Sequence, residues 1–554
     1  MNNVCRQCSS EFEVTNEDFD FLKKVSPVIG GEKYEIPPPT LCSDCRQQRR
    51  LAFRNERYLY KRSCDLCKKS VIGAFYENVP FPVYCVDCWW SDNWDPLEYG
   101  IDFDFSKPFF DQFNVLLNSV PKVTFLQLQN ENSEYNNLLA YSKNTYMSPG
   151  SYFLEDCCYC RKSQYCKDCL DCDFVNQSEL LYSCINAMNC YFCRNLVNCN
   201  NCRDCIYMMD CVGCSDCFMC ASFTKGQYCF KNKQYSKDEY NKIIEKKLNE
   251  SQENLLNEFL EFAGTVVKKM QNLINCENCS GDYLQNCKNS IECFDCFDLE
   301  DCKYVIESVG AKDSMDMSMH DKDIELCYEV CSGGESNKWV RFSYCPTAGF
   351  DSDYLHSCFY LTESFACNGF HSKNKHCILN KKYSEDDYQA MRKKIIEHMI
   401  KTGEYGEYFP IELSLFSYNE TIANEYFPMS KEEVIAKGWK WKDKNPKWYM
   451  KSDYKIPARI EEVEGDVVNK VLACEECGKN YKIQLKELGL CRKLKVNLSN
   501  KCPECRHMNL LSLKNPRNLW DRKCDKCGID LQTTYSSERS EKVYCEKCYL
   551  KEVY

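Results

Sequence analysis

The sequence lacks the marks of several common protein classes. Its 554 residues contain no run of about 18 apolar residues, so no membrane-spanning helix is expected. The opening residues, MNNVCRQCSSEF, have no apolar stretch of the signal-peptide type, which argues against export through Sec. Phosphate-loop, dinucleotide-binding and nucleophile-elbow motifs are also missing. We therefore expect a cytoplasmic protein with no membrane contact.

Histidine is rare in this sequence, and the chain has no net positive charge. Only six histidines are present, so metal sites would have to be built from thiolates rather than imidazoles. The net charge of −11 argues against nucleic acid coating the whole surface, and any such binding would need a local basic patch. The chain is nevertheless 44% hydrophobic and long enough for roughly three to five domains, so it can bury real cores.

Cysteine is the residue in excess, with 46 copies. In a secreted chain this number would indicate a disulfide framework. Here no secretion signal is present, and many of the cysteines recur as Cys-x-x-Cys pairs, a spacing suited to tetrahedral metal binding. We therefore expect the thiols to lie in a reducing compartment.

Sixteen of the cysteines form four Cys-x-x-Cys…Cys-x-x-Cys sets, two at each end of the chain. Two such knuckles supply four thiolates and close the metal shell to water, so we predict four structural zinc sites. A rubredoxin-like iron site is the alternative, and the knuckles could pair sequentially or be cross-braced. The predicted ligands are Cys5, Cys8, Cys42, Cys45, Cys64, Cys67, Cys85, Cys88, Cys474, Cys477, Cys502, Cys505, Cys524, Cys527, Cys545 and Cys548.

The two ends of the chain also match each other residue by residue. Arg46 aligns with Arg506, which lies 460 positions later, and Asn55 aligns with Asn515 at the same offset. The spacings between the last three knuckles are identical at the two ends. The sequence thus predicts two double zinc-ribbon modules of common ancestry.

The segment CRQQRRLAFRNERYLYKRSC of the N-terminal module mixes basic and aromatic side chains. Basic groups can neutralise phosphates and aromatic rings can stack on bases, so this segment is a candidate RNA or DNA surface. The alternative is a helix whose arginines pair with the acidic bulk of the chain. The candidate nucleic-acid contacts are Arg46, Arg49, Arg50, Arg54, Arg57, Lys61 and Arg62.

The middle of the chain repeats every three residues, as in Cys157, Cys160, Cys166, Cys169 and Cys172. This period fits neither an α-helix nor a flat strand, but it suits a solenoid of short strands and tight corners. Cysteine is small and usually buried, so it can fill a narrow interior. We predict a mainly β protein with two cysteine-rich parallel β-solenoid units. A metal-cluster protein, or further zinc sites among irregular loops, are the alternatives.

A helix is predicted after each solenoid run, with Ser236 and Ser384 as its N-cap. These helices could cover the open ends of the solenoids. The predicted order is an N-terminal double zinc-ribbon module (1–88), an aromatic and acidic linker (89–149), the first solenoid unit with its helix (150–272), the second with its helix (273–401), an aromatic connector (402–470) and a C-terminal double zinc-ribbon module (471–554).

Four stretches carry a resemblance to a known family: LCSDCRQQRRLAFRNERYLYKRSCDLC, YCFKNKQYSKDEY, EYGEYFPIELSLFSYNETIANEYFP and KNPRNLWDRKCDKCGIDLQTTYSSERSEKVYCEKCYLKEVY. They resemble uncharacterised zinc-ribbon proteins that are abundant in candidate-phyla bacteria with reduced genomes. The resemblance covers essentially the whole chain. It implies a bacterial, cytoplasmic zinc protein and contributes no catalytic residue.

The sequence contains no recognisable catalytic motif. Acid–base candidates for a solenoid face are Asp301, His320, Asp321, His356 and His371, but none lies in a known pattern. We favour a non-enzymatic zinc-binding protein that acts as a binding or scaffold module for RNA, a ribonucleoprotein or another protein. An enzyme that uses a solenoid face as its platform, and a metal or thiol store, are the alternatives. The oligomeric state is left open.

Overall fold

The computed structural model describes residues 1–452 and 454–553, which form two compact units. Unit 1 comprises residues 1–125 and 272–442, and unit 2 comprises residues 126–271 and 443–554. Each unit holds one long ladder of parallel strands and one of the two terminal modules. The N-terminal module shares its unit with the ladder that comes second in the sequence, and the C-terminal module shares its unit with the first.

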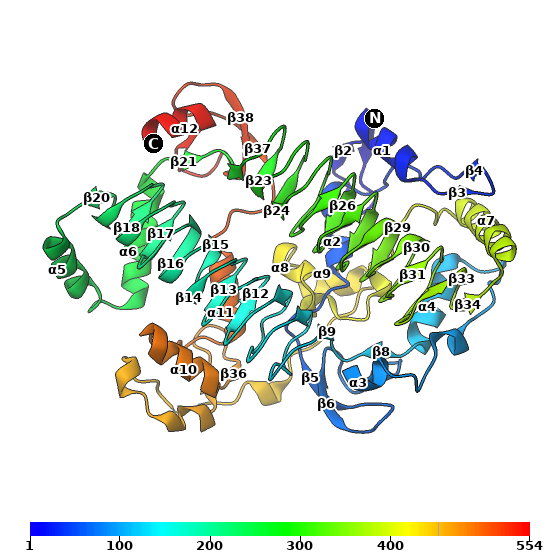
Figure 1. Cartoon of the computed structure of the whole chain (residues 1–554), viewed down its shortest axis with the longest axis horizontal. Helices are drawn as coiled ribbons and strands as arrows, with labels where there is room; N and C mark the ends of the chain where they lie inside the picture. The colour runs from blue at the N-terminus through cyan, green and yellow to red at the C-terminus, as the bar shows by residue number, and fades with distance from the viewer. Residues whose placement is uncertain (453, 554) are drawn as a thin grey trace. The chain divides into compact units, whose positions relative to one another are not determined.

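The first ladder (residues 127–230) is built from coils of twelve residues. Cys160 pairs with Cys172, and Cys217 pairs with Cys229, always in parallel register. One coil therefore contains four of the sequence triplets. Figure 1 shows the strands stacked side by side in cyan and green. They are β9 (Gln127–Leu128), β10 (Leu139–Ala140), β11 (Ser151–Tyr152), β12 (Cys158–Arg161), β13 (Leu170–Asp173), β14 (Glu179–Tyr182), β15 (Ile185–Met188), β16 (Tyr191–Asn200), β17 (Ile206–Met209), β18 (Ser215–Ala221) and β19 (Gln227–Phe230).

The second ladder (residues 273–378) is also parallel. Val340 pairs with Ser352 at the twelve-residue spacing, whereas Met315 pairs with Tyr328, so this coil holds one extra residue. Its strands are β22 (Leu273–Ile274), β23 (Gly281–Gln285), β24 (Cys293–Phe297), β25 (Ala311–Lys312), β26 (Met315–Ser318), β27 (Ile324–Glu325), β28 (Tyr328–Cys331), β29 (Asn337–Tyr344), β30 (Phe350–Asp353), β31 (Leu361–Thr362), β32 (Asn374–Lys375) and β33 (Cys377–Ile378).

The corners of the coils explain the triplet period. Every third residue has a positive φ, as at Asp168 (55°) and Asp171 (53°). Asparagine and aspartate tolerate this left-handed region better than other residues with a side chain. At some corners they also stack: the Asn186 amide donates to Asn198 Oδ1 (3.1 Å), and the Asn198 amide donates to Asp210 Oδ1 (2.9 Å). The aspartate ends the row because a carboxylate only accepts.

Inside the coils, cysteine and serine fill the narrow core and satisfy the backbone. The Cys160 thiol lies within hydrogen-bonding distance of the carbonyls of Cys158 (3.4 Å) and Cys169 (3.3 Å). Ser148 Oγ accepts the N–H of Cys160 at 3.1 Å. These side chains are buried in the coil interior, where an unpaired polar group would be costly. A small side chain with a weak donor is therefore well suited to this position.

Outside the coils, alternating charges stack from one coil to the next. In the first ladder Lys143 pairs with Glu131 (3.2 Å) and Lys167 with Glu155 (2.8 Å). The second ladder repeats the pattern at the pairs Lys312–Glu300 (2.9 Å) and Lys338–Glu325 (2.7 Å). A slip of one coil by a single residue would remove these pairs, so the column favours the observed register.

The first ladder begins earlier than the sequence indicates. Gln127 already pairs with Leu139, so residues 126–149 belong to the ladder and not to the predicted linker (89–149). The inward residues of these early coils, among them Ser142, Thr145 and Ser148, are buried without being cysteines. A search for cysteine triplets therefore misses them, although they fill the same kind of position.

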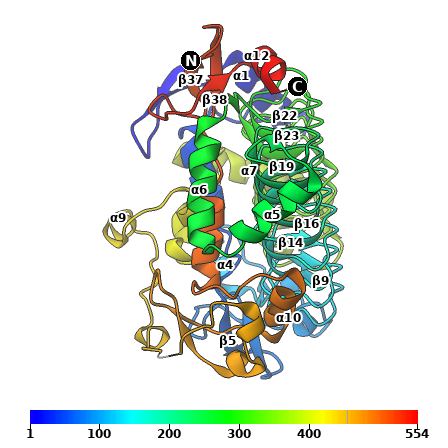
Figure 2. The ribbon, with the colours of Figure 1, turned by 90° about the vertical axis from the view of Figure 1, so that its left-hand side faces the viewer.

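The helices after the ladders begin as predicted. Ser236 caps α5 (Lys237–Lys247) by accepting the N–H of Glu239, and Ser384 caps α7 (Glu385–Thr402) by accepting the N–H of Asp387. A further helix, α6 (Gln252–Thr265), follows α5. In unit 2, Leu255 and Phe259 of α6 pack against Tyr207 and Phe218 of the ladder. Figure 2 shows α5 and α6 in green beside these coils.

From their second knuckle onward, the two terminal modules contain the same elements 460 residues apart, and before it the N-terminal module has an additional short hairpin at residues 28–33. The N-terminal module holds β1 (Asn2–Val4), β2 (Glu11–Glu13), α1 (Asn16–Val25), β3 (Val28–Ile29), β4 (Glu32–Lys33), α2 (Ser43–Leu51), β5 (Tyr60–Ser63), β6 (Ser70–Gly73), β7 (Val83–Tyr84) and α3 (Val86–Trp89). The C-terminal module holds β35 (Leu472–Ala473), β36 (Asn480–Tyr481), α10 (Leu485–Leu494), α11 (Pro503–Leu511), β37 (Trp520–Lys523), β38 (Asp530–Thr533), β39 (Val543–Tyr544) and α12 (Glu546–Val553).

The remaining elements connect these parts. In unit 1, β7 pairs with β8 (Lys122–Val123), and in unit 2, β39 pairs in the same parallel manner with β21 (Lys268–Lys269). No helix within the described residues is both long and apolar enough to cross a membrane. The other elements are η1 (Pro96–Tyr99), α4 (Phe109–Ser119), β20 (Lys233–Gln234), β34 (Lys381–Lys382), η2 (Ile411–Leu413), η3 (Tyr418–Glu420), α8 (Ala423–Tyr426), α9 (Lys431–Ala436), η4 (Pro446–Trp448), η5 (Ile460–Glu462) and η6 (Gly465–Asn469).

Candidate metal centres

The sixteen predicted ligands come together as four tetrads, each with its four sulfur atoms within 4.8 Å of one another. Their grouping agrees with the four predicted sets, and each tetrad joins two knuckles that are neighbours in the sequence. The tetrads are Cys5, Cys8, Cys42 and Cys45; Cys64, Cys67, Cys85 and Cys88; Cys474, Cys477, Cys502 and Cys505; and Cys524, Cys527, Cys545 and Cys548.

The distances between the sulfur atoms fit a tetrahedral metal site. One sulfur–sulfur distance in each tetrad, in chain order, is 3.7, 3.8, 3.7 and 3.7 Å. Four thiolates at about 2.3 Å from a zinc ion would lie about 3.8 Å apart. A disulfide would bring the sulfur atoms to about 2.05 Å. The cavity between the four sulfur atoms thus has the size of a thiolate-bound divalent ion, and all 46 cysteines are free thiols.

The turns and helix starts at the knuckles orient the cysteine side chains of each tetrad. The first knuckle of each tetrad ends in a residue of positive φ, namely Ser9, Lys68, Gly478 or Gly528. The second knuckle lies at the start of a helix, where free N–H groups favour a thiolate. In the second tetrad the N–H of Cys85 donates to Cys64 Sγ at 3.2 Å, and the N–H of Cys545 donates to Cys524 Sγ at 3.3 Å in the fourth.

These contacts and burial give the cysteines of one tetrad different pKa values. Burial opposes ionisation of Cys64, but N–H groups of Cys85, Cys67 and Leu66 prevail and lower its pKa to about 7. In the same tetrad, burial raises the pKa of Cys88. Without a metal, therefore, one thiolate is favoured while its neighbour holds its proton. A divalent ion is needed to keep four thiolates so close together.

One cysteine of each tetrad is exposed: Cys8, Cys67, Cys477 and Cys527. All four are the second cysteine of a first knuckle. The tetrads therefore lie at the surface of their modules, within reach of chelators in solution.

The basic residues of the N-terminal module lie mostly inside unit 1. From α2, Arg46 reaches Asp316 (2.8 Å), Arg49 reaches Glu329 (2.9 Å) and Arg50 reaches Glu329 (3.0 Å). Asp316 and Glu329 stand on neighbouring coils of the second ladder. Burial opposes the charge of Glu329, but the three arginines outweigh it and lower the pKa of this carboxyl group. The helix is thus held to the ladder by a buried ionic network.

The prediction of a nucleic-acid surface needs correction for these residues. Arg46, Arg49, Arg50 and Arg54 are buried, and a phosphate could reach their guanidinium groups only by displacing their partners. Arg54 pairs with Glu56 at 2.6 Å. The alternative, an intramolecular use of the arginines, describes what the structure contains.

The other three predicted nucleic-acid contacts, Arg57, Lys61 and Arg62, lie in different surroundings. Arg57 is partly buried and pairs with Glu425 at 2.5 Å, and Arg62 pairs with Asp65 at 2.8 Å. Lys61 is exposed, so its contact with nucleic acid stays a prediction. The carboxylates that hold α2 were missed because they lie more than 260 residues away in the sequence. The one available signal was the arginine shared at positions 46 and 506.

The acid–base candidates do not form a common site. His320 contacts the carbonyl of Val330 through Nε2 at 2.9 Å, and His356 packs against Tyr344. Burial lowers the pKa of His356 well below its usual value. His371 lies against tryptophan rings, Asp301 accepts from the Asn289 amide at 2.9 Å, and the N–H of Asp321 donates to Gly333 O. Among the described residues, the four cysteine tetrads are the groups of three or more such ligands close enough to hold a metal.

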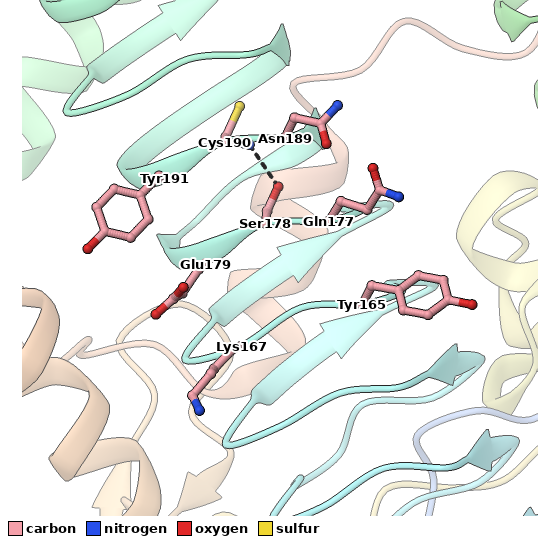
Figure 3. Close-up of a pocket in the computed structure, with 8 residues that line it drawn as sticks. All are labelled: Tyr165, Lys167, Gln177, Ser178, Glu179, Asn189, Cys190 and Tyr191. Carbon is pink, nitrogen blue, oxygen red and sulfur yellow. Dashed lines mark hydrogen bonds between the residues drawn. The ribbon is translucent and has the colours of Figure 1, made fainter.

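The first ladder has a surface hollow of about 430 Å³. Figure 3 shows Tyr165 and Tyr191 on opposite sides of this hollow. Lys167 and Glu179 also line it, and they lie on two coils that are next to each other. At its base the N–H of Cys190 donates to Ser178 Oγ at 3.0 Å. Ser178 and Cys190 belong to the buried interior of the coils, and the tyrosines and charged residues belong to their outward columns. No nucleophile–base pair is formed among them.

Neither a comparison with protein-family models nor a search of curated proteins gave a match to this chain. The class of the protein therefore rests on its own geometry. That geometry defines a metal-binding protein with four groups of four cysteines, two groups in each terminal module.

Proposed function

We propose that the protein is a cytoplasmic, non-enzymatic binding scaffold stabilised by four structural zinc ions. In this proposal, two double zinc-ribbon modules of common origin are each mounted on a β-solenoid. The observation that carries it is the sulfur–sulfur spacing of 3.7–3.8 Å in all four tetrads. Such closed four-thiolate shells leave no position for a substrate or water, which favours a structural role.

Zinc is favoured over iron by the structural role that the sites serve. Zinc has no redox chemistry and no geometric preference of its own, so it accepts the tetrahedral shape set by the knuckles. Its binding would supply folding energy on the order of 10 kcal/mol for each site. Such support matters most for small modules, because a short chain buries a smaller fraction of its surface on folding.

The metal sites are coupled to the packing of the modules on the ladders. Cys42 is the N-cap residue of helix α2 and Cys502 is that of helix α11, and both are predicted ligands. Within one turn of these ligands, Arg46 contacts Asp316 and Arg506 contacts Asp171 on a ladder. A metal that fixes the start of the helix thereby fixes the arginine. This link supports a scaffold whose binding surfaces depend on metal.

Metal storage is the weaker alternative. The ladder thiols lie in the core and contact backbone carbonyls, as Cys193 does with Tyr191 at 3.2 Å. Buried thiols of this kind are poor ligands unless the coil opens. The described residues also bring no further group of ligands together beyond the tetrads.

Metal analysis of the purified protein tests the proposal. We expect four zinc ions per chain by native mass spectrometry and elemental analysis. Cys64→Ser should reduce the count to three, whereas the matched ladder variant Cys193→Ser should keep four. Iron in place of zinc, or a count that Cys64→Ser leaves unchanged, would contradict the proposal.

A further inference from the structure

A basic segment lies beside the hairpin of the third tetrad in unit 2. Residues 444–452, KNPKWYMKS, contain three lysines and no acid. The N–H of Met450 donates to Asn480 Oδ1 at 2.7 Å, and the Asn480 amide donates to Met450 O at 2.8 Å. Because Asn480 belongs to β36 of the tetrad hairpin, these bonds fix the segment beside the metal site.

Aromatic side chains lie among these lysines. The ring of Trp448 is 39% exposed, although tryptophan is usually well covered. The ammonium of Lys479, on the hairpin, lies 5.5 Å from the Trp448 ring centre, and that of Lys444 lies 5.6 Å from Tyr449. Charges and ring faces are thus combined in one patch, here called the Trp448 patch: Lys444, Lys447, Trp448, Lys451 and Lys479.

The lysines of this segment differ from those on the ladders. Lys143, Lys167 and Lys312 each pair with a glutamate one coil away. Lys444, Lys447 and Lys451 are exposed, and no ion pair to them is found within residues 1–452 and 454–553. Their charge is therefore available to a partner.

We propose that the Trp448 patch binds single-stranded nucleic acid. Lysine ammonium groups would neutralise phosphates, and the exposed indole would stack on a base. A single strand is favoured over a duplex because only unpaired bases present their faces for stacking. An acidic peptide would use the lysines but leave the indole without a role. The inference rests on the proposed function, since the metal must hold the hairpin that carries Asn480 and Lys479.

The test is a titration of the full-length, metal-loaded protein with fluorescein-labelled twelve-nucleotide oligo(U) and oligo(dT). Anisotropy is recorded at 50 and 200 mM KCl. Three variants are compared with the parent protein: Trp448→Ala, the triple variant Lys444→Ala, Lys447→Ala and Lys451→Ala, and the matched control Lys143→Ala, Lys167→Ala and Lys312→Ala.

We expect binding that weakens with salt and that falls at least tenfold in the patch triple variant. Trp448→Ala should weaken it by about fivefold or more with little change in the salt dependence, because stacking carries no charge. The ladder triple variant should bind like the parent protein. The ratio of oligo(U) to oligo(dT) affinity then tells whether the sugar is read.

Three results would overturn the inference: no binding at 50 mM KCl, equal loss in both triple variants, or full competition by polyglutamate with no effect of Trp448→Ala. The last result would assign the patch to an acidic protein. The zinc content and unfolding temperature are measured on the same samples. Four zinc ions without binding would refute only this inference, whereas missing zinc would refute the proposed function.

Discussion

The two terminal modules have matching cysteine tetrads and share their elements from the second knuckle onward, yet they pack on their ladders by different chemistry. In unit 1, α2 places Arg50 between Asp316 (3.1 Å) and Glu329 (3.0 Å). In unit 2, the residue 460 positions later is Leu510, which packs against Ile185 and Val197. One equivalent position is thus ionic in one unit and apolar in the other.

The arginine one helical turn earlier, Arg46 or Arg506, is present in both modules. Arg506 reaches Asp171 at 3.1 Å and Glu487 at 2.7 Å, much as Arg46 reaches Asp316. Helix α10 adds an apolar contact, with Leu488 and Leu494 in one cluster with ladder residues of unit 2. The comparison teaches that the cysteine tetrad and the first arginine are common to both helices, while the rest of the contact can be ionic or apolar.

Loss of a metal ligand should have the largest effect. Cys45→Ser and Cys505→Ser should each lose one zinc ion and the folding energy of that site, on the order of 10 kcal/mol. The buried thiol Cys491, outside the tetrads, provides the control Cys491→Ala, which should keep all metal. Elemental analysis and hydrogen exchange of each module measure the outcome. Retention of four zinc ions in either serine variant would contradict the metal assignment.

The next largest effect on stability should come from exchanging the residues at the equivalent positions 50 and 510. Arg50→Leu leaves Asp316 and Glu329 with too little positive charge in a buried site, so we expect a loss of about 3–5 kcal/mol in the free energy of unfolding of unit 1. The reverse change, Leu510→Arg, places a charge in an apolar cluster and should destabilise unit 2.

Urea unfolding of both variants measures this pair of effects. The double variant Arg50→Leu with Glu329→Gln is the control, because it removes the excess negative charge and should recover part of the loss. A loss below about 1 kcal/mol in Arg50→Leu would mean that the ionic network does not hold the helix.

The two units should also respond differently to pH. Burial raises the pKa of Asp171 from 3.8 to about 7, with Glu487 also raising it and Arg506 and His507 opposing. For a carboxyl group with a raised folded-state pKa, the stability is present below the unfolded value and is lost as the pH rises through the folded value. Unit 2 should therefore lose about 1 kcal/mol between pH 6 and pH 8.

In unit 1, Glu329 should contribute no such loss, although burial raises the pKa of its neighbour Asp316. The pKa of Glu329 is lowered, so its stability is present above the usual value of 4.5 and is lost only as the pH falls below that value. Chemical unfolding from pH 6 to pH 8, where zinc stays bound, compares the units. Asp171→Asn should remove the slope of unit 2, and an unchanged slope would assign it to another group.

The knuckle turns should give the smallest effect. Ser9 and Lys68 have positive φ where the C-terminal module has Gly478 and Gly528. A non-glycine residue in this region costs about 1 kcal/mol. Ser9→Gly or Lys68→Gly should raise the unfolding temperature of unit 1 slightly, and Gly478→Ser should lower that of unit 2. A lower unfolding temperature for Ser9→Gly or Lys68→Gly, or a higher one for Gly478→Ser, would contradict this account of the turns.

Much of the metal site could be read from the sequence, since a Cys-x-x-Cys knuckle is a local feature. The sixteen cysteines of the four tetrads were found in this way, and so were the N-caps at Ser236 and Ser384. The fate of the arginines could not be read, because whether Arg50 is exposed depends on Glu329 of the second ladder. Early coils such as those at Ser142 were missed because serine replaces cysteine there.

The sequence by itself determined the four sets of cysteines, the triplet period and the match between the two ends, because each follows from side-chain chemistry over short spacings. Only the tertiary structure decided the sequential pairing of knuckles and the twelve-residue coil. It also decided that each terminal module shares a unit with the ladder that is more distant from it in the sequence. The physical reason is that these depend on contacts such as Arg46 with Asp316, between residues 270 positions apart. No local pattern encodes which buried carboxylate will neutralise a given guanidinium group.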